Sequence, residues 1–134
     1  MKLVQIRKAL VEELTSFWVR EDVKLIFRNV ESVDITELVE GFIRFRVKFG
    51  GAKQANVSRT PFSRIYGDAI FQVFVPNNEG TASGLLYIDE LSEHFGYKTL
   101  GGIHLQTPSP GDDDIRDGWW SMELRIPFYA DSNT

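Results

Sequence analysis

Residues 42–49 read FIRFRVKF, in which large apolar side chains alternate with three basic ones. Successive side chains of an extended chain point to opposite faces, so Ile43, Phe45, Val47 and Phe49 would share one face. The three cations would then share the other. This period of two predicts a half-buried strand with a basic outer face.

The segments that follow extend this strand into a sheet. Residues 50–61 (GGAKQANVSRTP) show no period and few large side chains, which predicts a long polar loop. Residues 63–75 predict a long strand whose last part is apolar on both faces, as expected of a central strand covered on each side. Further strands are predicted at residues 23–27, 102–106 and 119–128.

Two segments have apolar residues at helical spacing. Residues 2–18 predict an amphipathic helix, whose apolar stripe is Leu3, Ile6, Leu10, Leu14 and Phe17. A second helix is predicted to start after Thr81 as its N-cap and to end at Gly96. Its expected buried stripe is Ala82, Leu85, Ile88, Leu91 and Phe95.

The order of these elements indicates the fold class. Residues 107–118 (TPSPGDDDIRDG) predict a second long polar loop, and residues 30–40 give no clear assignment. Helices and strands that occur in runs, without regular alternation, are typical of an α+β fold. We therefore expect a single domain over residues 1–134, with a mixed, mostly antiparallel sheet and two helices packed on one face.

Composition excludes several kinds of site. Apolar residues make up 43% of the chain and charged residues 25%, as in ordinary globular proteins. There is no cysteine, which excludes disulfides, thiolate metal sites and cysteine nucleophiles. No apolar run approaches the roughly 18 residues that span a bilayer, and charges interrupt the first residues of the chain. We therefore expect a cytoplasmic protein with no membrane partner.

Charge is distributed unevenly along the chain. The net charge is −4, yet residues 42–64 contain six basic residues and no acidic one. Such a segment could bind a polyanion, bind the acidic side of another copy of the chain, or simply be a solvated strand face. The six residues are Arg44, Arg46, Lys48, Lys53, Arg59 and Arg64.

The acidic residues and histidines do not match a known catalytic or metal-binding pattern. The cluster of Asp112, Asp113, Asp114 and Asp117 lacks the alternate ligand spacing and the final Glu of a calcium-binding loop. We interpret it as a solvated or partner-facing segment. His94 and His104 are interpreted as structural or surface residues. With no nucleophile elbow and no phosphate-binding glycine loop in the sequence, we expect a binding or assembly protein without catalytic residues, metal or cofactor.

Five segments follow the opening amphipathic helix in an order that matches a known family. They are Phe27-Arg28-Asn29, FIRFRVKFG (42–50), RIYGDAIFQVFVP (64–76), NNEGTASGLLYIDELSEHF (77–95) and DGWWSMELRIPFYAD (117–131). Together they resemble the tail terminator proteins of long-tailed bacteriophages, over nearly the whole chain. The segment at 77–95 carries most of this resemblance, because it combines a turn after a proline-ended strand with a helix closed by Phe95.

The resemblance implies a structural role. Such a protein forms a six-fold ring of its own copies, although it can be monomeric in solution. The ring caps the tail tube, ends tube polymerisation and presents a surface to a head-completion or neck protein. It would be assembled in the bacterial cytoplasm and remain at the head-proximal end of the virion tail, where passing DNA could touch it weakly.

The resemblance also implies how the charges could be used. In a closed ring one surface of each subunit contacts a different surface of the next. The basic segment 42–64 and the acidic segment 112–117 could be these complementary surfaces, or the basic residues could face the channel. One alternative is a nucleic-acid-binding module that uses the basic segment, although no aromatic stacking face is evident. Another alternative is an enzyme with an unrecognised site.

Overall fold

The computed structural model describes residues 2–20, 23–27, 41–54, 63–77 and 81–132. The described chain folds into two helices and one seven-stranded sheet. In chain order the elements are α1 (Leu3–Phe17), β1 (Lys24–Phe27), β2 (Phe42–Gln54), β3 (Ser63–Pro76), α2 (Ala82–Phe95), β4 (Thr99–Leu100), β5 (Ile103–Leu105), β6 (Ser109–Arg116) and β7 (Trp119–Ser132). Neither described helix is long and apolar enough to cross a membrane.

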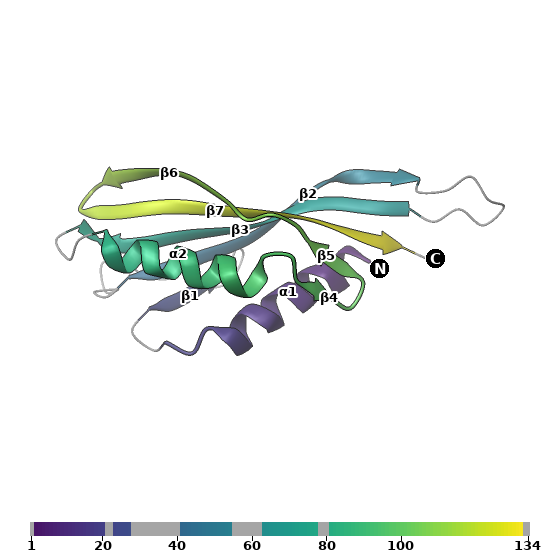
Figure 1. The fold of residues 1–134 in the computed structure, drawn as a ribbon, viewed down its shortest axis with the longest axis horizontal. Coiled ribbons are helices and arrows are strands. Elements are labelled where there is room, and N and C mark those ends of the chain that lie inside the picture. The colour runs from purple at the N-terminus through teal and green to yellow at the C-terminus, as the bar shows by residue number, and fades with distance from the viewer. Residues whose placement is uncertain (1, 21–22, 28–40, 55–62, 78–80, 133–134) are drawn as a thin grey trace.

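The sheet is mixed, as the sequence predicts. Its order is β1-β2-β3-β7-β5-β4, and β6 also pairs with β7. Strand β1 runs parallel to β2, and every other pair is antiparallel. The two helices lie on one side of the sheet (Figure 1). The predicted α+β fold is therefore confirmed.

The main hydrophobic core lies between the helices and the sheet. Ile6, Leu10 and Leu14 of α1 are fully buried, as the predicted stripe requires, while Leu3 at the beginning of the helix is 48% exposed. Their core partners include Phe71 of β3 and residues of β2, α2 and β7. We call the helix-covered side of the sheet the inner face and the opposite side the outer face.

Strand register assigns each residue of β2 to a face. Phe45 pairs with Phe71 on the inner face, and Arg44 pairs with Gln72 on the outer face. The strand continues past Phe49 through a register shift and ends only at Gln54. The predicted loop at 50–61 is therefore wrong for its first five residues, and its remainder lies outside the described residues.

The predicted loop at 107–118 is wrong over most of its length, because it contains strand β6. This strand forms a hairpin with β7, and Arg116 pairs with Trp119 across a two-residue turn. Asp117 and Gly118 occupy that turn with φ of 53° and 83°. Positive φ at both positions is the geometry that an Asp-Gly hairpin turn favours. All eight residues of β6 are exposed, so the strand lacks the apolar alternation that would have indicated it.

Helix α2 has the predicted bounds, and Ile88, Leu91 and Phe95 of the predicted stripe are buried, but its first turn differs. Ala82 and Leu85 are exposed, whereas Gly84 and Tyr87 are buried. An added Cβ at Gly84 would lie 2.1 Å from the Trp120 ring, so glycine lets the helix approach the sheet closely. Thr81 stands at the N-cap as predicted, yet its side chain makes no capping hydrogen bond, and the helix ends at Gly96 as expected.

Candidate interaction surface

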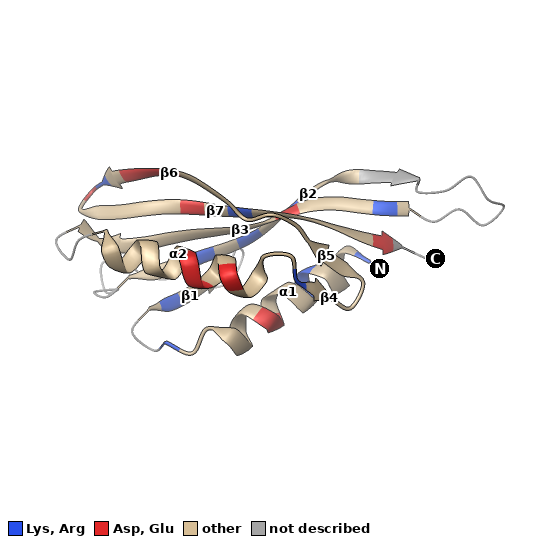
Figure 2. Ribbon diagram, in the orientation of Figure 1, with Lys and Arg blue, Asp and Glu red and all other residues tan. Residues whose placement is uncertain are grey.

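Four of the six predicted basic residues can be placed in detail. Arg44, Arg46 and Lys48 lie on the outer face of β2, as the alternation predicts, and Arg64 lies near the beginning of β3. Figure 2 shows basic residues along β1 and β2 and acidic residues gathered near the end of β6. Lys53 belongs to β2, but its side chain lies outside the described residues, as does Arg59 altogether.

The outer face balances part of its own positive charge. Arg46 lies 3.9 Å from Glu123 of β7, and the guanidinium of Arg125 donates a hydrogen bond of 3.1 Å to the same carboxylate. Arg125 also pairs with Asp68 of β3 at 3.7 Å. Exposed ion pairs contribute only about 0–1 kcal/mol each, so this chain of charges orients side chains more than it stabilises the fold. The basic segment is thus less unbalanced than its sequence indicates.

Arg64 is also paired within the chain. Its Nε donates a 2.8 Å hydrogen bond to Asp131 of β7, and its guanidinium lies 4.5 Å from the centre of the Tyr129 ring. The hydrogen bond from Arg64 lowers the pKa of Asp131 below its usual value. Arg64 therefore connects β3 to β7, and its interactions are those of a structural residue.

An aromatic cluster occupies the outer face where β2 begins. Phe42 stacks on Phe74 with ring centres 4.4 Å apart, and Trp119 meets Phe42 edge to face at 5.2 Å. The guanidinium of Arg44 lies 5.5 Å from the Phe74 ring centre, within cation–π range. Aromatic side chains that the sequence did not reveal therefore accompany the basic residues, with Phe42 buried and Phe74 and Trp119 half-buried. The strand register explains why the sequence pattern did not reveal this cluster. Phe42 and Phe74 stand at positions that the alternation assigns to the polar face.

A pocket of about 460 Å³ opens beside this cluster. Ile26 and Phe27 of β1 line it together with Arg44, Arg46 and Gln72. The pocket thus combines an apolar wall with two guanidinium groups. Arginine and aromatic side chains are the residues most enriched at protein interfaces, because both bury large surfaces and can still hydrogen-bond or stack.

The predicted acidic residues lie on β6 and in its turn, all of them exposed. The Asp113 carboxylate accepts a 2.9 Å hydrogen bond from the Trp120 indole Nε1, and Asp114 pairs with Arg116 at 3.5 Å. Asp117 occupies the hairpin turn. Among the residues that the structure describes, no three carboxylates or histidines gather as a metal site would require. The basic and acidic sets do not contact each other within one chain in any ion pair that the structure shows.

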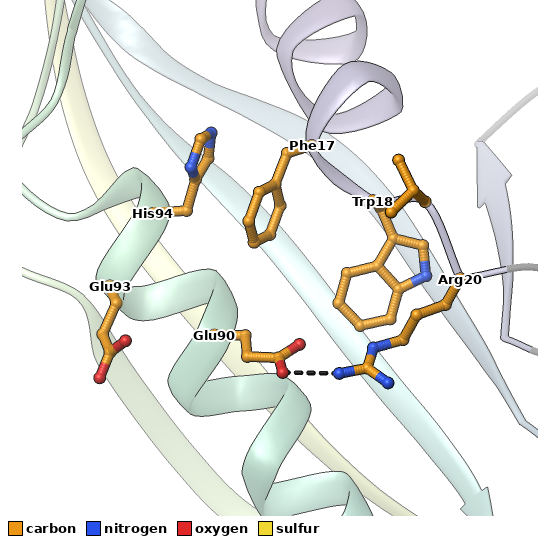
Figure 3. A pocket seen from close by; sticks show the side chains of 7 residues that line it. Phe17, Trp18, Arg20, Glu90, Glu93 and His94 are labelled. Carbon is orange, nitrogen blue, oxygen red and sulfur yellow. Dashed lines mark hydrogen bonds and ion pairs between the residues drawn. The ribbon is translucent and has the colours of Figure 1, made fainter.

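A second pocket, of about 680 Å³, lies between the end of α1 and the second half of α2 (Figure 3). Arg20 crosses it and donates a 2.6 Å hydrogen bond to Glu90. The same guanidinium lies 5.1 Å from the centre of the Tyr87 ring and 5.7 Å from that of Trp18. These contacts hold the segment after α1 against α2.

His94 is packed at the same helix junction. Its ring stacks on Phe17 at 3.9 Å, and its Nε2–H donates a 2.8 Å hydrogen bond to Glu13 of α1. Lys98 approaches the same carboxylate at 3.2 Å. The hydrogen bond from His94, with a smaller effect of Lys98, lowers the pKa of Glu13. His104 stacks on Tyr129 at 4.7 Å, so each histidine makes a packing contact with an aromatic ring.

No protein-family model matches the chain, and no curated protein matches it. The fold itself recurs among solved structures. One solved chain superposes with a TM-score of 0.72 over 98% of this chain and 96% of its own length, at 17% sequence identity. A similarity at this level of identity shows a shared fold alone.

Proposed function

We propose that the protein is a structural assembly protein that forms a ring of its own copies and caps a bacteriophage tail tube. In this role it ends tube growth and presents a joining surface to a head-completion or neck protein. The proposal rests on the sequence resemblance to tail terminators and on one structural observation. That observation is the outer face, where exposed Arg44 lies beside an aromatic cluster of buried Phe42 and half-buried Phe74 and Trp119 and, in the described chain, no helix covers them.

The outer face has the composition of a protein-binding surface. Phe42 and Ile70 are each 1% exposed on this face, and neither belongs to the main core. Ile70 lies in register between Arg46 and Arg125, and long arginine stems cover apolar surface of this kind. The half-buried rings of Phe74 and Trp119 remain for apolar contact beside the arginine charges, which suits a subunit that must recognise another protein.

The experiment that tests this function combines the purified protein with tail tubes and examines them by negative-stain electron microscopy. We expect a ring at one tube end, and abnormally long tubes when the protein is left out. The proposed function is wrong if the protein stays monomeric with tubes present and tubes lacking it keep their normal length.

A pair of variants tests the outer face itself. Arg44→Glu reverses the charge beside the aromatic cluster and should weaken capping by about tenfold or more. Glu93→Lys makes an equally large charge change on the exposed side of α2 and should leave capping unchanged. If both variants cap tubes equally well, the outer face does not take part in capping.

A second candidate is binding of single-stranded nucleic acid. The observation that favours it is Arg44 beside the half-buried rings of Phe74 and Trp119, because aromatic rings with flanking cations can stack bases and contact phosphates. Affinity for an oligonucleotide should then fall steeply between low and high salt. No measurable binding at low salt excludes this candidate.

A further inference from the structure

One row of outer-face positions runs across strands β1, β2 and β3. Strand register places Ile26, Arg44 and Gln72 side by side in this row. The pocket of about 460 Å³ beside the aromatic cluster opens here, and Phe27 and Arg46 complete its described lining. We call this site the arginine pocket. It has an apolar wall on β1 and hydrogen-bonding groups on β2 and β3.

Arg44 has no carboxylate partner among the described residues. Its guanidinium lies beside the Phe74 ring and makes no ion pair or hydrogen bond that the structure shows. Glu123 of β7 stands in the same row, but strand β3 lies between the two residues. Neighbouring strands are about 4.8 Å apart, so the backbones at Arg44 and Glu123 are about 10 Å apart. The charge of Arg44 is therefore left for a ligand.

Arg46 is only loosely paired. It lies 3.9 Å from the Glu123 carboxylate, and that carboxylate has a closer cation in Arg125, at 3.1 Å. Arg44 and Arg46 stand two positions apart on the same face of β2, and both line the pocket. A planar guanidinium suits a carboxylate because it can donate two parallel hydrogen bonds to it. Two such groups at one pocket favour an anionic ligand.

Gln72 narrows the choice of anion. Its side chain is half-buried, and its amide makes no hydrogen bond that the structure shows within the described chain. An amide side chain has two N–H donors and one carbonyl acceptor, so its ligand should both accept and donate. A peptide with an acidic side chain offers a carboxylate and backbone N–H groups. The phosphodiester backbone of a nucleic acid offers acceptor oxygens alone.

We propose that the arginine pocket binds a glutamate or aspartate side chain in an extended segment of a tail tube subunit. The carboxylate would lie between Arg44 and Arg46, and Gln72 would hydrogen-bond a neighbouring peptide group. An apolar side chain beside the carboxylate would pack on the half-buried wall of Ile26 and Phe27. Charge favours this occupant, because no carboxylate is among the described residues that line the pocket. This inference deepens the proposed function and rests on it for the identity of the partner.

Two short peptides test the pocket without tail tubes. Both are acetylated and amidated, with a leucine beside the central residue, which is glutamate in one peptide and glutamine in the other. The unchanged protein should bind the glutamate peptide about tenfold more tightly, because only that peptide supplies charge-assisted hydrogen bonds. Titration followed by ¹⁵N NMR measures both affinities, and the side-chain amide signal of Gln72 should shift. Equal affinities, or an unmoved Gln72 signal, would overturn the inference.

Three variants locate the binding. Arg44→Gln should lose the preference for the glutamate peptide, about tenfold. Lys48→Gln is the matched control, because it removes one charge from the same face of β2 outside the described lining of the pocket. It should keep the preference. Gln72→Glu places a carboxylate in register with Arg44 and should also lose the preference. If Arg44→Gln and Lys48→Gln discriminate between the peptides equally well, the inference is overturned.

Two further probes distinguish other occupants. One is a short single-stranded oligonucleotide, and the other is a peptide with the sequence of residues 109–116, SPGDDDIR. Both should displace the glutamate peptide poorly when added at the same concentration. Strong displacement by the oligonucleotide would assign the pocket to nucleic acid. Strong displacement by the 109–116 peptide would assign it to a second copy of the chain. Either result would overturn the inference.

Competition on tail tubes tests the partner. An excess of the glutamate peptide should weaken capping by the unchanged protein, and the same excess of the glutamine peptide should not. If rings cap the tubes and neither peptide affects them, the inference is overturned and the proposed function stands. If the protein binds the glutamate peptide selectively but forms no ring on tubes, the proposed function is wrong, and the tube subunit is excluded as the partner.

Discussion

The two faces of the sheet use the same strands in different ways. On the inner face, β2, β3 and β7 contribute large apolar side chains that pack against α1 and α2. On the outer face the same strands carry a chain of ion pairs, from Arg46 through Glu123 and Arg125 to Asp68, beside one aromatic cluster. Burial of apolar surface stabilises a fold far more than exposed ion pairs do. The difference indicates that the inner face holds the fold together, whereas the outer face of the described chain contributes little stability outside its aromatic cluster.

The comparison is tested most strongly by neighbouring residues on opposite faces of β3. Phe71 is fully buried, with ring centres 5.0 Å from Phe45 and 5.1 Å from Phe95. Phe71→Ala should lower the free energy of unfolding by about 3–5 kcal/mol, because it removes core contacts and leaves a cavity. The control Gln72→Ala should cost less than about 1 kcal/mol. Urea unfolding measures both, and similar losses would mean that the faces do not differ in this way.

The aromatic cluster sharpens the comparison, since it is a part of the outer face that resembles a core. Phe42→Ala should lower the free energy of unfolding by about 2–4 kcal/mol, because the side chain is buried between Phe74 and Trp119. Phe42→Leu should recover much of this loss in the same urea measurement. A loss as small as that of Gln72→Ala would show that the cluster contributes binding surface and little stability.

The smallest expected effect on the free energy of unfolding concerns the hydrogen bond between Glu13 of α1 and His94 of α2. The Glu13 pKa lies below its ordinary value of 4.5 in the folded protein, chiefly because His94 donates a hydrogen bond to it. The ionised Glu13 carboxylate therefore stabilises the folded protein above about pH 4.5. This contribution is lost as the pH falls through the lower pKa that Glu13 has in the folded state. Glu13→Gln should cost under about 1 kcal/mol at pH 7.

The stability of the Glu13→Gln variant should also fall less between pH 7 and pH 3 than that of the unchanged protein. Urea midpoints at the two pH values measure this difference. The neighbouring Glu12→Gln serves as the control, because Glu12 is exposed on α1 and lies 4.0 Å from Lys8. If both variants show the same pH dependence, the contact with His94 is not responsible.

Sequence patterns predicted most of the sheet but missed its edge. The alternation at 42–49 placed β2 and both of its faces correctly, because a strand with one buried face must repeat with a period of two. Strand β6 was missed because an exposed edge strand has no buried face to impose that period. Asp117-Gly118 was the available signal, since this dipeptide between two extended segments is a strong hairpin indicator.

The candidate site was only partly predictable for a related reason. The sequence identified Arg44 and Arg46 as outer-face residues, and the structure places them there. It did not indicate that Glu123 would lie beside Arg46, or that Phe42 would stack on Phe74, because these pairs join strands distant along the chain. Such pairs depend on the register between strands, which nearby residues do not specify.

The sequence by itself determined the two helices, the long strands and the basic face of β2, since local periodicity is a property of neighbouring residues. Only the tertiary structure decided which charges find partners within the chain and which do not. Pairing of β3 with β7 gives Arg64 and Arg46 their carboxylates, whereas it leaves the aspartates of β6 at the edge of the sheet. Charge on a sequence becomes a binding surface only after folding has set which charges are near each other.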